Sequence, residues 1–185
     1  FYEDNEKVVK KVCKITRSSI SYILKLIPPI LEEIVKQAIF IFTTRHYDCI
    51  LYLISTIIDK LDSEKDLIDG LFIACKAFFI SSFDALRVET TLNMAIVEEL
   101  LNLSEMCLSS NMAGIFLRDP IILPLIDIAI ESCRVEDKTA NKSALKFLTT
   151  LLSCDGGDAQ LKAIVLEAMT KYGEKIIKTL IRSTV

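Results

Sequence analysis

The chain has 185 residues, 51% of them apolar and 25% charged, and its formal net charge is −3. These values exclude a disordered chain, and the slightly acidic balance argues against a dedicated nucleic-acid-binding domain, which normally carries a basic excess. Glycine and proline are scarce, with five and four residues, so we expect helices joined by short loops rather than a strand-rich fold. The longest uncharged apolar runs, such as Cys49 to Ile58, reach about half of the roughly 20 residues that a membrane-spanning helix needs, so no membrane span is predicted.

Pairs of helices are expected to repeat along the whole chain. Successive pairs begin about 43, 42 and 47 positions apart, close to the period of HEAT repeats, which is about 40–47 residues. The fold class predicted from this spacing is all-α: an α-α superhelix of about four and a half HEAT-like hairpins, which binds other molecules through its surfaces. The expected helix pairs are at about 5–44, 48–83, 90–134 and 137–172, followed by a terminal helix at 173–185.

The first helix is predicted from about Asn5 to Leu26, with two stripes at spacings of three or four residues. The apolar stripe, expected to pack inward, consists of Val8, Val12, Ile15, Ser19, Tyr22 and Leu26. The basic stripe, on the flank or the opposite face, consists of Lys7, Lys10, Lys11, Lys14 and Arg17. Pro28-Pro29 ends this helix, and Pro29 can serve as the first residue of the next one. That second helix is expected to bury Ile30, Ile34, Ala38, Ile41 and Phe42.

Polar residues mark the helix starts of the second pair. Asp48 is expected to cap the helix that follows it, and Ser63 with Asp66 resembles a capping box before a helix at about 65–83. Gly70 within that helix costs up to about 1 kcal/mol relative to alanine, and we attribute its presence to close backbone packing. The positions expected to face inward are Leu67, Leu71, Cys75, Phe78 and Phe79.

The third pair is predicted to open with a helix at about 91–110 that buries Met94, Val97, Leu100, Leu101, Met106 and Leu108. Asp119-Pro120 should start its partner helix, because a capping carboxylate followed by proline suits a first turn. Asp137 is expected to open the fourth pair, and Gly156-Gly157 to form a turn before a helix capped by Asp158. The inward positions expected in the fourth pair are Ala140, Ala144, Leu148, Leu151 and Leu152.

Few residues in the sequence suit catalysis or metal binding. The six cysteines are widely spaced, without a CxxC pair, and His46 is the single histidine, which excludes the usual zinc signatures. We expect buried, reduced thiols and a reducing compartment. His46 falls in a predicted helix junction, where a polar turn residue is expected, and the motifs GxxxxGK[ST] and GxGxxG are absent from the sequence. We therefore predict no catalytic residue, no metal site, no cofactor and no enzymatic activity.

The basic stripe of the first helix is the local feature that suggests a function. Its lysines and Arg17 recur every three or four residues, so several positive charges share one surface. Such a surface can meet a phosphorylated or acidic segment through charge-assisted hydrogen bonds. A solvated, lysine-rich face is the alternative interpretation, and periodicity alone favours it, because lysines commonly fill exposed helix positions.

Two stretches of the sequence resemble the same family, in the same order. Pro28-Pro29, followed by His46–Ser55 (HYDCILYLIS) and Asp59, resembles the proline-led helix and the H-x-x-C/S-x-L-Y-L-x-S helix of the transportin-SR branch of importin-beta-type nuclear transport receptors. Ala140–Leu148 (ANKSALKFL) is similar to the D-A-N-x-S-x-x-R/K-F-L helix of that branch. Weaker similarity, which extends the resemblance over nearly the whole chain, lies in Ile96–Leu100, Ile122–Ile126 and Tyr172-Gly173.

The resemblance implies a long HEAT solenoid of roughly 20 repeats, of which this chain would be a C-terminal, cargo-holding fragment. In that family an arginine-rich helix grips the Arg-Ser-rich regions of splicing factors, which are often phosphorylated. The first helix here corresponds to it, with Lys10, Lys14 and Arg17 at basic positions of the family. The implied partners are protein cargo, including Arg-Ser-rich splicing factors, and, through the full-length receptor, Ran GTPase and nucleoporins. Ran is expected to bind outside this segment, no nucleic acid or membrane is bound directly, and the receptor shuttles between nucleus and cytoplasm.

The sequence departs from the family pattern within the basic helix. Lys10 and Lys14 stand where arginine is usual, which gives up the bidentate fork suited to phosphate, and Ser21 replaces a further arginine. Other interpretations therefore stay open. An exportin or a phosphatase scaffold would share the HEAT architecture, whereas an all-α enzyme or a membrane-surface protein would belong to a different class.

Overall fold

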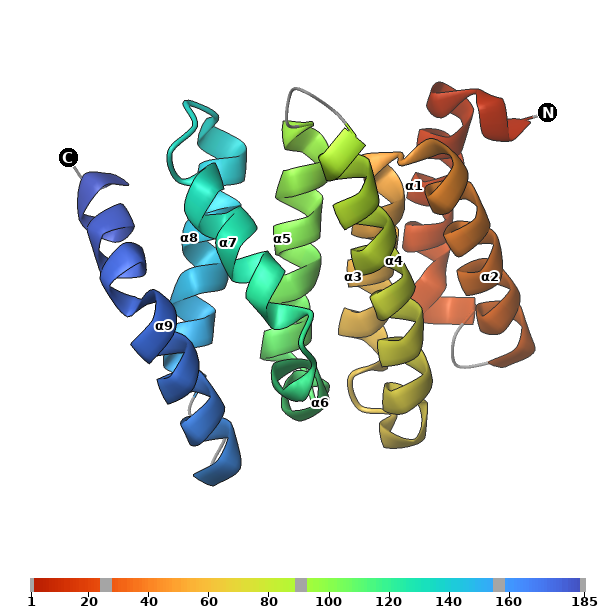
Figure 1. Ribbon diagram of the computed structural model, residues 1–185. Coiled ribbons are helices and arrows are strands. Elements are labelled where there is room, and N and C mark those ends of the chain that lie inside the picture. The colour runs from red at the N-terminus through yellow and green to blue at the C-terminus, as the bar shows by residue number, and fades with distance from the viewer. Residues whose placement is uncertain (1, 24–27, 89–92, 155–158, 184–185) are drawn as a thin grey trace.

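The computed structural model describes residues 2–23, 28–88, 93–154 and 159–183, and every regular element within these ranges is helical (Figure 1). The all-α class and the helical-repeat solenoid predicted from the sequence are confirmed. The elements are η1 (Tyr2–Asp4), α1 (Glu6–Ile23), α2 (Pro28–Arg45), α3 (Asp48–Leu61), η2 (Lys65–Leu67), α4 (Ile68–Val88), α5 (Met94–Ser109), α6 (Ala113–Arg118), α7 (Ile122–Ser132), α8 (Lys138–Ser153) and α9 (Ala159–Ser183).

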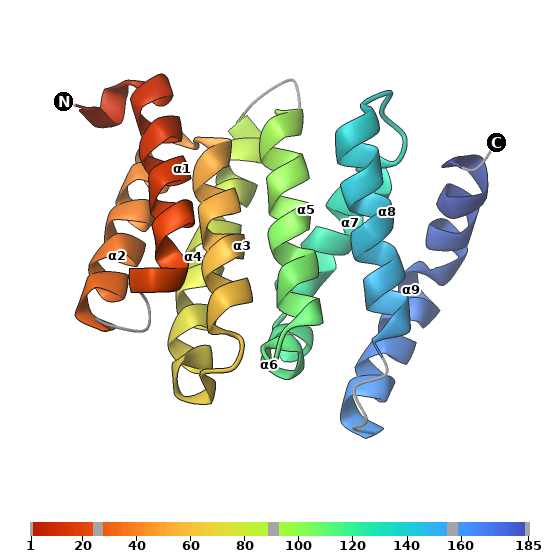
Figure 2. The same ribbon diagram turned by 180° about the vertical axis from the view of Figure 1, so that it is seen from behind.

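The helices lie in two layers. The first layer contains α1, α3, α5 and α8, each in contact with the next (Figure 2). The second layer contains α2, α4, the short α6 with α7, and α9 (Figure 1). The chain alternates between the layers, so the described residues stack as the pairs α1–α2, α3–α4, α5 with α6–α7, and α8–α9. Because α1 and α9 lie at opposite ends of this stack, the molecule is an elongated rod (Figures 1 and 2).

The pairs begin near the expected positions, but the C-terminal half differs in detail. α9 is one continuous helix from Ala159 to Ser183, so a separate terminal helix beginning at 173 is not formed. In the third pair, the short helix α6 precedes α7, and the sequence pattern did not indicate it. The turn expected at Gly156-Gly157, with Asp158 as a cap, lies outside the described residues.

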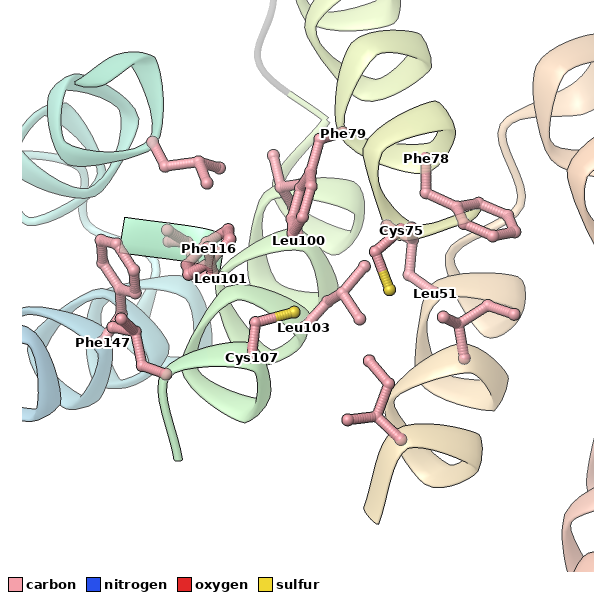
Figure 3. Close-up of a cluster of buried hydrophobic side chains, with 14 of the residues drawn as sticks. Leu51, Cys75, Phe78, Phe79, Leu100, Leu101, Leu103, Cys107, Phe116 and Phe147 are labelled. Atoms are coloured by element: carbon pink, nitrogen blue, oxygen red, sulfur yellow. The ribbon is translucent and has the colours of Figure 1, made fainter. Parts of the chain in front are cut away.

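Buried aromatic rings join successive pairs into one core. Phe42 and Phe78 lie edge to face with ring centroids 5.5 Å apart, and Phe79 and Phe116 stack at the same distance. Figure 3 shows Phe78, Phe79 and Phe116 together with Phe147 of α8. All five rings are fully buried. Because burial of such a side chain contributes about 1.5–3 kcal/mol, the ring contacts between α2, α4 and α6 help to hold the stack together.

Most positions expected to face inward in the second to fourth pairs, and in α2, are buried. Leu152 and Ile30 are exposed instead, at the surface of α8 and α2. Among the positions expected to face inward, those that are only partly buried are Ile34, Leu67, Met94 and Met106. The helical period therefore indicated the correct face of the middle helices.

The inward stripe predicted for the first helix is wrong. Its exposed members are Val8, Val12, Ile15 and Tyr22, and the last two are 66% and 77% exposed. Ser19 is partly buried, and Leu26 lies outside the described residues. The buried side of α1 consists of Val9, Cys13 and Ile20. Within the described chain, α1 has a layer neighbour, α3, on one side only, and the period could not tell which side that would be.

Side-chain caps decide where α5 and α8 begin. The Asn93 Oδ1 atom accepts a hydrogen bond from the Ile96 amide at 3.4 Å. The Asp137 Oδ1 atom accepts from the amides of Thr139 and Ala140, both at 3.0 Å, as expected for an N-cap residue. The hydrogen bonds from Ala140 and Thr139 hold the pKa of the Asp137 carboxyl below its usual value. Both caps satisfy amides that have no partner within the helix.

Asp48 does not cap α3. It is the first residue of that helix, and Tyr47 precedes it without a side-chain cap. The Asp48 carboxylate is instead directed to Lys10 of α1, with Oδ1 3.3 Å from the Lys10 Nζ atom. The carboxylate therefore joins two helices of the first layer rather than closing the end of one.

Two other expectations for the helix starts are also wrong. The capping box is not formed, because Glu64 is the N-cap residue of η2 and makes no side-chain cap bond. α7 begins at Ile122 rather than Pro120, although the Asp119 Oδ1 atom still accepts a hydrogen bond from the Ile121 amide at 3.1 Å. Gly70 is not explained by close packing, because a Cβ atom there would meet nothing within 4 Å.

Polar contacts join the second helix pair to the third and the third to the fourth. The Lys76 Nζ atom donates to Asp119 Oδ2 at 2.7 Å, across 43 positions of sequence. The Lys146 Nζ atom donates to Glu105 Oε2 at 2.8 Å, across 41 positions. Further along, the Tyr172 hydroxyl donates to Asp127 Oδ2 at 3.4 Å, across 45 positions. The spacing of these contacts matches the repeat period of about 40–47 residues.

Candidate functional site

Lys10 lies on the side of α1 that faces α3. Its Nζ atom is 2.8 Å from Glu6 Oε1, one turn earlier, and 3.3 Å from Asp48 Oδ1. The hydrogen bond that Lys10 donates to Glu6 and the nearby negative charge of Asp48 raise the pKa of Lys10. Two carboxylates therefore already surround this ammonium group before any ligand arrives.

Lys14 follows one turn later on the same helix and is exposed. Among the described residues it has no ion-pair partner, in contrast to Lys10. Its ammonium group can therefore turn toward an incoming anion without breaking an existing contact. Of the three cargo-binding residues predicted from the sequence, Lys14 is the best placed for a first electrostatic contact.

Arg17 lies on the α3-facing side of α1, above Tyr52 of α3. The guanidinium carbon is 3.8 Å from the centroid of the Tyr52 ring, which is the geometry of a cation–π contact. The Nε and Nη1 atoms of Arg17 are shielded from solvent and form no hydrogen bond. The structure thus brings Lys10 and Arg17 to one seam between α1 and α3, whereas Lys14 of α1 is exposed.

Carboxylates continue this surface onto α5. The Glu99 Oε2 atom is shielded from solvent and forms no hydrogen bond. Burial raises the pKa of the Glu99 carboxyl, as do the charges of Glu98 and Asp48, whereas a hydrogen bond from Asn102 and the charge of Arg17 oppose that rise. The surface therefore carries positive charge on α1 and negative charge on α3 and α5.

Tyr52 and Glu99 were not predicted as site residues. Tyr52 stands in an apolar run and therefore counted as a core residue, although its side chain is 49% exposed. The missed signal is a less apolar stripe along α3, at Asp48, Tyr52, Thr56 and Asp59. For Glu99 we find no signal in the sequence, because two adjacent glutamates on a helix are ordinary surface residues.

His46 occupies the junction between α2 and α3 with φ of 53°, in the left-handed region. Its Nε2 atom lies 3.3 Å from the Ser81 hydroxyl oxygen, and its ring meets Phe42 edge to face. In the part of the chain that the structure describes, no carboxylate bonds to His46, so this contact is a Ser–His pair and not a triad. The prediction of a turn residue at this junction is confirmed.

The cysteines do not form a metal-binding cluster in the described residues. Cys13, Cys75 and Cys107 are buried, and the other three are partly buried. Burial raises the pKa of the Cys133 thiol to about 11, which keeps it protonated at neutral pH. Residues 2–23, 28–88, 93–154 and 159–183 hold no group of three or more His, Cys, Asp or Glu side chains arranged for a metal ion. Among the described helices, none has both the length and the apolar character needed to cross a bilayer.

Taken together, the stacked pairs define a helical-repeat scaffold, and a surface of mixed charge lies on α1, α3 and α5. Residues 1–86 match the family model of the Transportin-3/Importin-13 fourth TPR domain. This match covers α1, α2, α3 and most of α4, and includes Lys10, Lys14, Arg17 and Tyr52. The resemblance predicted from the sequence is therefore confirmed over residues 1–86, which are similar to a repeat segment of the importin-beta/transportin type of karyopherin.

Proposed function

We propose that the chain is a cargo-binding segment of a nuclear import receptor of the transportin-SR type, acting in Ran-dependent transport of proteins between cytoplasm and nucleus. The observation that carries the proposal is the family match over residues 1–86, the part that contains the basic helix α1. Stacked repeats support this role, because solenoids present long surfaces on which a protein partner can lie.

The proposed cargo is an anionic segment, and specifically the phosphorylated Arg-Ser-rich region of a splicing factor. Lys10, Lys14 and Arg17 are the residues that we propose to bind it. Phosphate groups meet the positive charges of α1, and the arginines of the cargo meet carboxylates such as Asp48 on α3. A hydrogen bond to a charged group contributes about 1.5–3 kcal/mol, so a few such contacts give a useful affinity.

The remaining steps of transport are assigned to a longer receptor. Ran GTPase and nucleoporins are proposed to bind elsewhere on it, and small rotations between repeats let the solenoid wrap its cargo or release it. The segment itself is proposed to be non-enzymatic, to bind neither nucleic acid nor membrane directly, and to shuttle with the receptor between nucleus and cytoplasm.

A direct binding measurement tests the role of α1. A fluorescent peptide of alternating arginine and phosphoserine is titrated with the chain, and fluorescence anisotropy gives Kd. Lys14→Glu should weaken binding at least about tenfold, because it removes one charge-assisted contact and adds repulsion. Lys36→Glu, at an exposed position of α2, is the matched charge control and should have little effect. Equal Kd values for wild type and Lys14→Glu would remove α1 from the cargo site.

A second experiment tests the direction of transport. Cargo is captured from nuclear extract by the receptor that carries this segment, with and without GTP-loaded Ran. Release of cargo by Ran supports an import receptor. Cargo gained with Ran would indicate an exportin, the principal alternative, and no response to Ran would indicate a HEAT scaffold outside nuclear transport.

A further inference from the structure

Tyr52 is an exposed aromatic residue on a helix whose other large apolar side chains are buried. Leu51, Leu53 and Ile54 next to it are buried in the core, whereas the Tyr52 ring is 49% exposed. The ring therefore adds little to the core for its size. What it contacts is the guanidinium of Arg17, whose central carbon is 3.8 Å from the ring centroid.

This contact limits how Arg17 can be reached. Two guanidinium nitrogens, Nε and Nη1, are shielded from solvent and form no hydrogen bond. A ligand can therefore approach the guanidinium only through Nη2. Arginine usually binds phosphate through two parallel hydrogen bonds. In this arrangement, Arg17 can bind a ligand through one nitrogen atom, Nη2.

The contact of Arg17 with Tyr52 forms although the carboxylates of Glu99 and Asp48 lie near Arg17. Glu99 of α5 carries a shielded Oε2 atom without a hydrogen bond, and Asp48 of α3 is directed to Lys10. Among the described residues, Arg17 forms no ion pair with either of them. The flat ring of Tyr52 is thus the group that sets where the guanidinium lies.

We propose that Tyr52 positions Arg17 for the anionic group of the cargo, and that this group is bound through a single nitrogen of Arg17 beside the free ammonium of Lys14. The inference rests on the proposed function and specifies the chemistry of that site. Recognition of the cargo then depends on the fixed position of the Arg17 charge, and not on a bidentate hydrogen bond to phosphate. Tyr52 is a positioning residue, since it acts through Arg17 and need not touch the ligand.

The test is a double-mutant cycle on the arginine–phosphoserine peptide, measured by anisotropy at low ionic strength. Tyr52→Leu should weaken binding about two- to fivefold, the range expected for loss of an exposed cation–π contact. Tyr52→Phe keeps the aromatic face and should bind like wild type. In an Arg17→Gln background, Tyr52→Leu should have no further effect, because the residue that it positions is gone.

Three outcomes would overturn the inference. The first is unchanged binding by Tyr52→Leu. The second is a loss with Tyr52→Phe equal to that with Tyr52→Leu, which would assign the effect to the hydroxyl group. The third is an equal loss with and without Arg17, which would indicate a general structural role. Thermal unfolding of each variant, followed by circular dichroism, should give wild-type midpoints, because the ring is half exposed.

Failure of this inference is distinguishable from failure of the proposed function. If wild type binds the peptide and Lys14→Glu weakens binding, but Tyr52→Leu does not, then the cargo site stands and the role of Tyr52 falls. If wild type does not bind the peptide at all, both fall together.

Discussion

Helices α1 and α5 belong to the same layer, but α1 contacts one neighbour of that layer, α3, whereas α5 lies between α3 and α8 (Figure 2). On α5, residues on several sides of the helix are buried, including Val97, Leu100, Leu101 and Leu103. On α1, four large side chains of the apolar stripe are exposed: Val8, Val12, Ile15 and Tyr22. The comparison teaches that the place of a helix in the stack, more than its composition, decides which apolar residues stabilise the fold.

The largest test of this comparison is a pair of alanine substitutions. Leu101→Ala on α5 should lower the free energy of unfolding by about 2–5 kcal/mol, because it leaves a cavity in a fully buried site. Ile15→Ala on α1 should change it by less than about 0.5 kcal/mol, since Ile15 is already in solvent. Urea unfolding followed by circular dichroism gives both values. Similar losses for the two variants would mean that α1 is covered in solution.

The polar contact between α5 and α8 gives the next largest effect. Glu105 is buried, and its carboxylate accepts hydrogen bonds from Lys146 Nζ and Ser109 Oγ, both at 2.8 Å. Lys146→Met should lower the free energy of unfolding by about 1–2 kcal/mol, because Glu105 loses its charged donor while Ser109 remains. Lys36→Met is the control, since the pair of Lys36 with Glu32 is exposed on both sides, and it should cause no measurable change. Equal effects would contradict the importance of burial.

The cap of α5 should contribute somewhat less. Asn93→Ala removes the oxygen that accepts from the Ile96 amide and should cost about 1 kcal/mol in urea unfolding. Asn93→Asp keeps an oxygen at this position and should stay close to wild type. A loss with Asn93→Asp as large as that with Asn93→Ala would show that the cap bond does not set the start of α5.

The smallest expected effect is a pH dependence of stability caused by Glu99. This residue of α5 lies near α1 and α3. Burial raises the pKa of Glu99 above its ordinary value of 4.5, so the folded state holds this proton more tightly than the unfolded state. Its contribution to stability is therefore present below about pH 4.5 and is lost as pH rises through the folded pKa. Glu99→Gln should be more stable than wild type at neutral pH, and the difference should vanish in acid.

The measurement for Glu99 is thermal unfolding across that pH range. Glu98→Gln removes a neighbouring charge that also raises the pKa of Glu99, so it should reduce the pH dependence of stability without abolishing it. A wild-type stability curve that does not fall between about pH 4.5 and neutral, relative to Glu99→Gln, would show that Glu99 is solvated in the folded protein.

The sequence was sufficient for the fold class, and for most of the buried positions expected in α4, α5 and α8. For α1 it was not, because a helix with two apolar stripes packs on the side where a neighbour lies, and that is decided by tertiary structure. An aspartate at a helix start was a reliable sign of an N-cap when its carboxylate formed no ion pair. Asp137 caps α8, whereas the carboxylate of Asp48 pairs with Lys10. The positive charges of the candidate site could be read from spacing. Tyr52 was missed, since a tyrosine in an apolar run is ordinarily a core residue and the less apolar stripe that contains it was overlooked.

The contacts of Lys76, Lys146 and Tyr172 each span one repeat and no more. Cooperativity in such a rod is passed only between adjacent units, as in a one-dimensional zipper. A terminal hairpin can therefore fray without melting the centre, and assembly needs no distant part of the chain to meet before nearby parts have docked. Because each contact joins only adjacent helix pairs, bending between two pairs leaves the contacts between the other pairs unchanged.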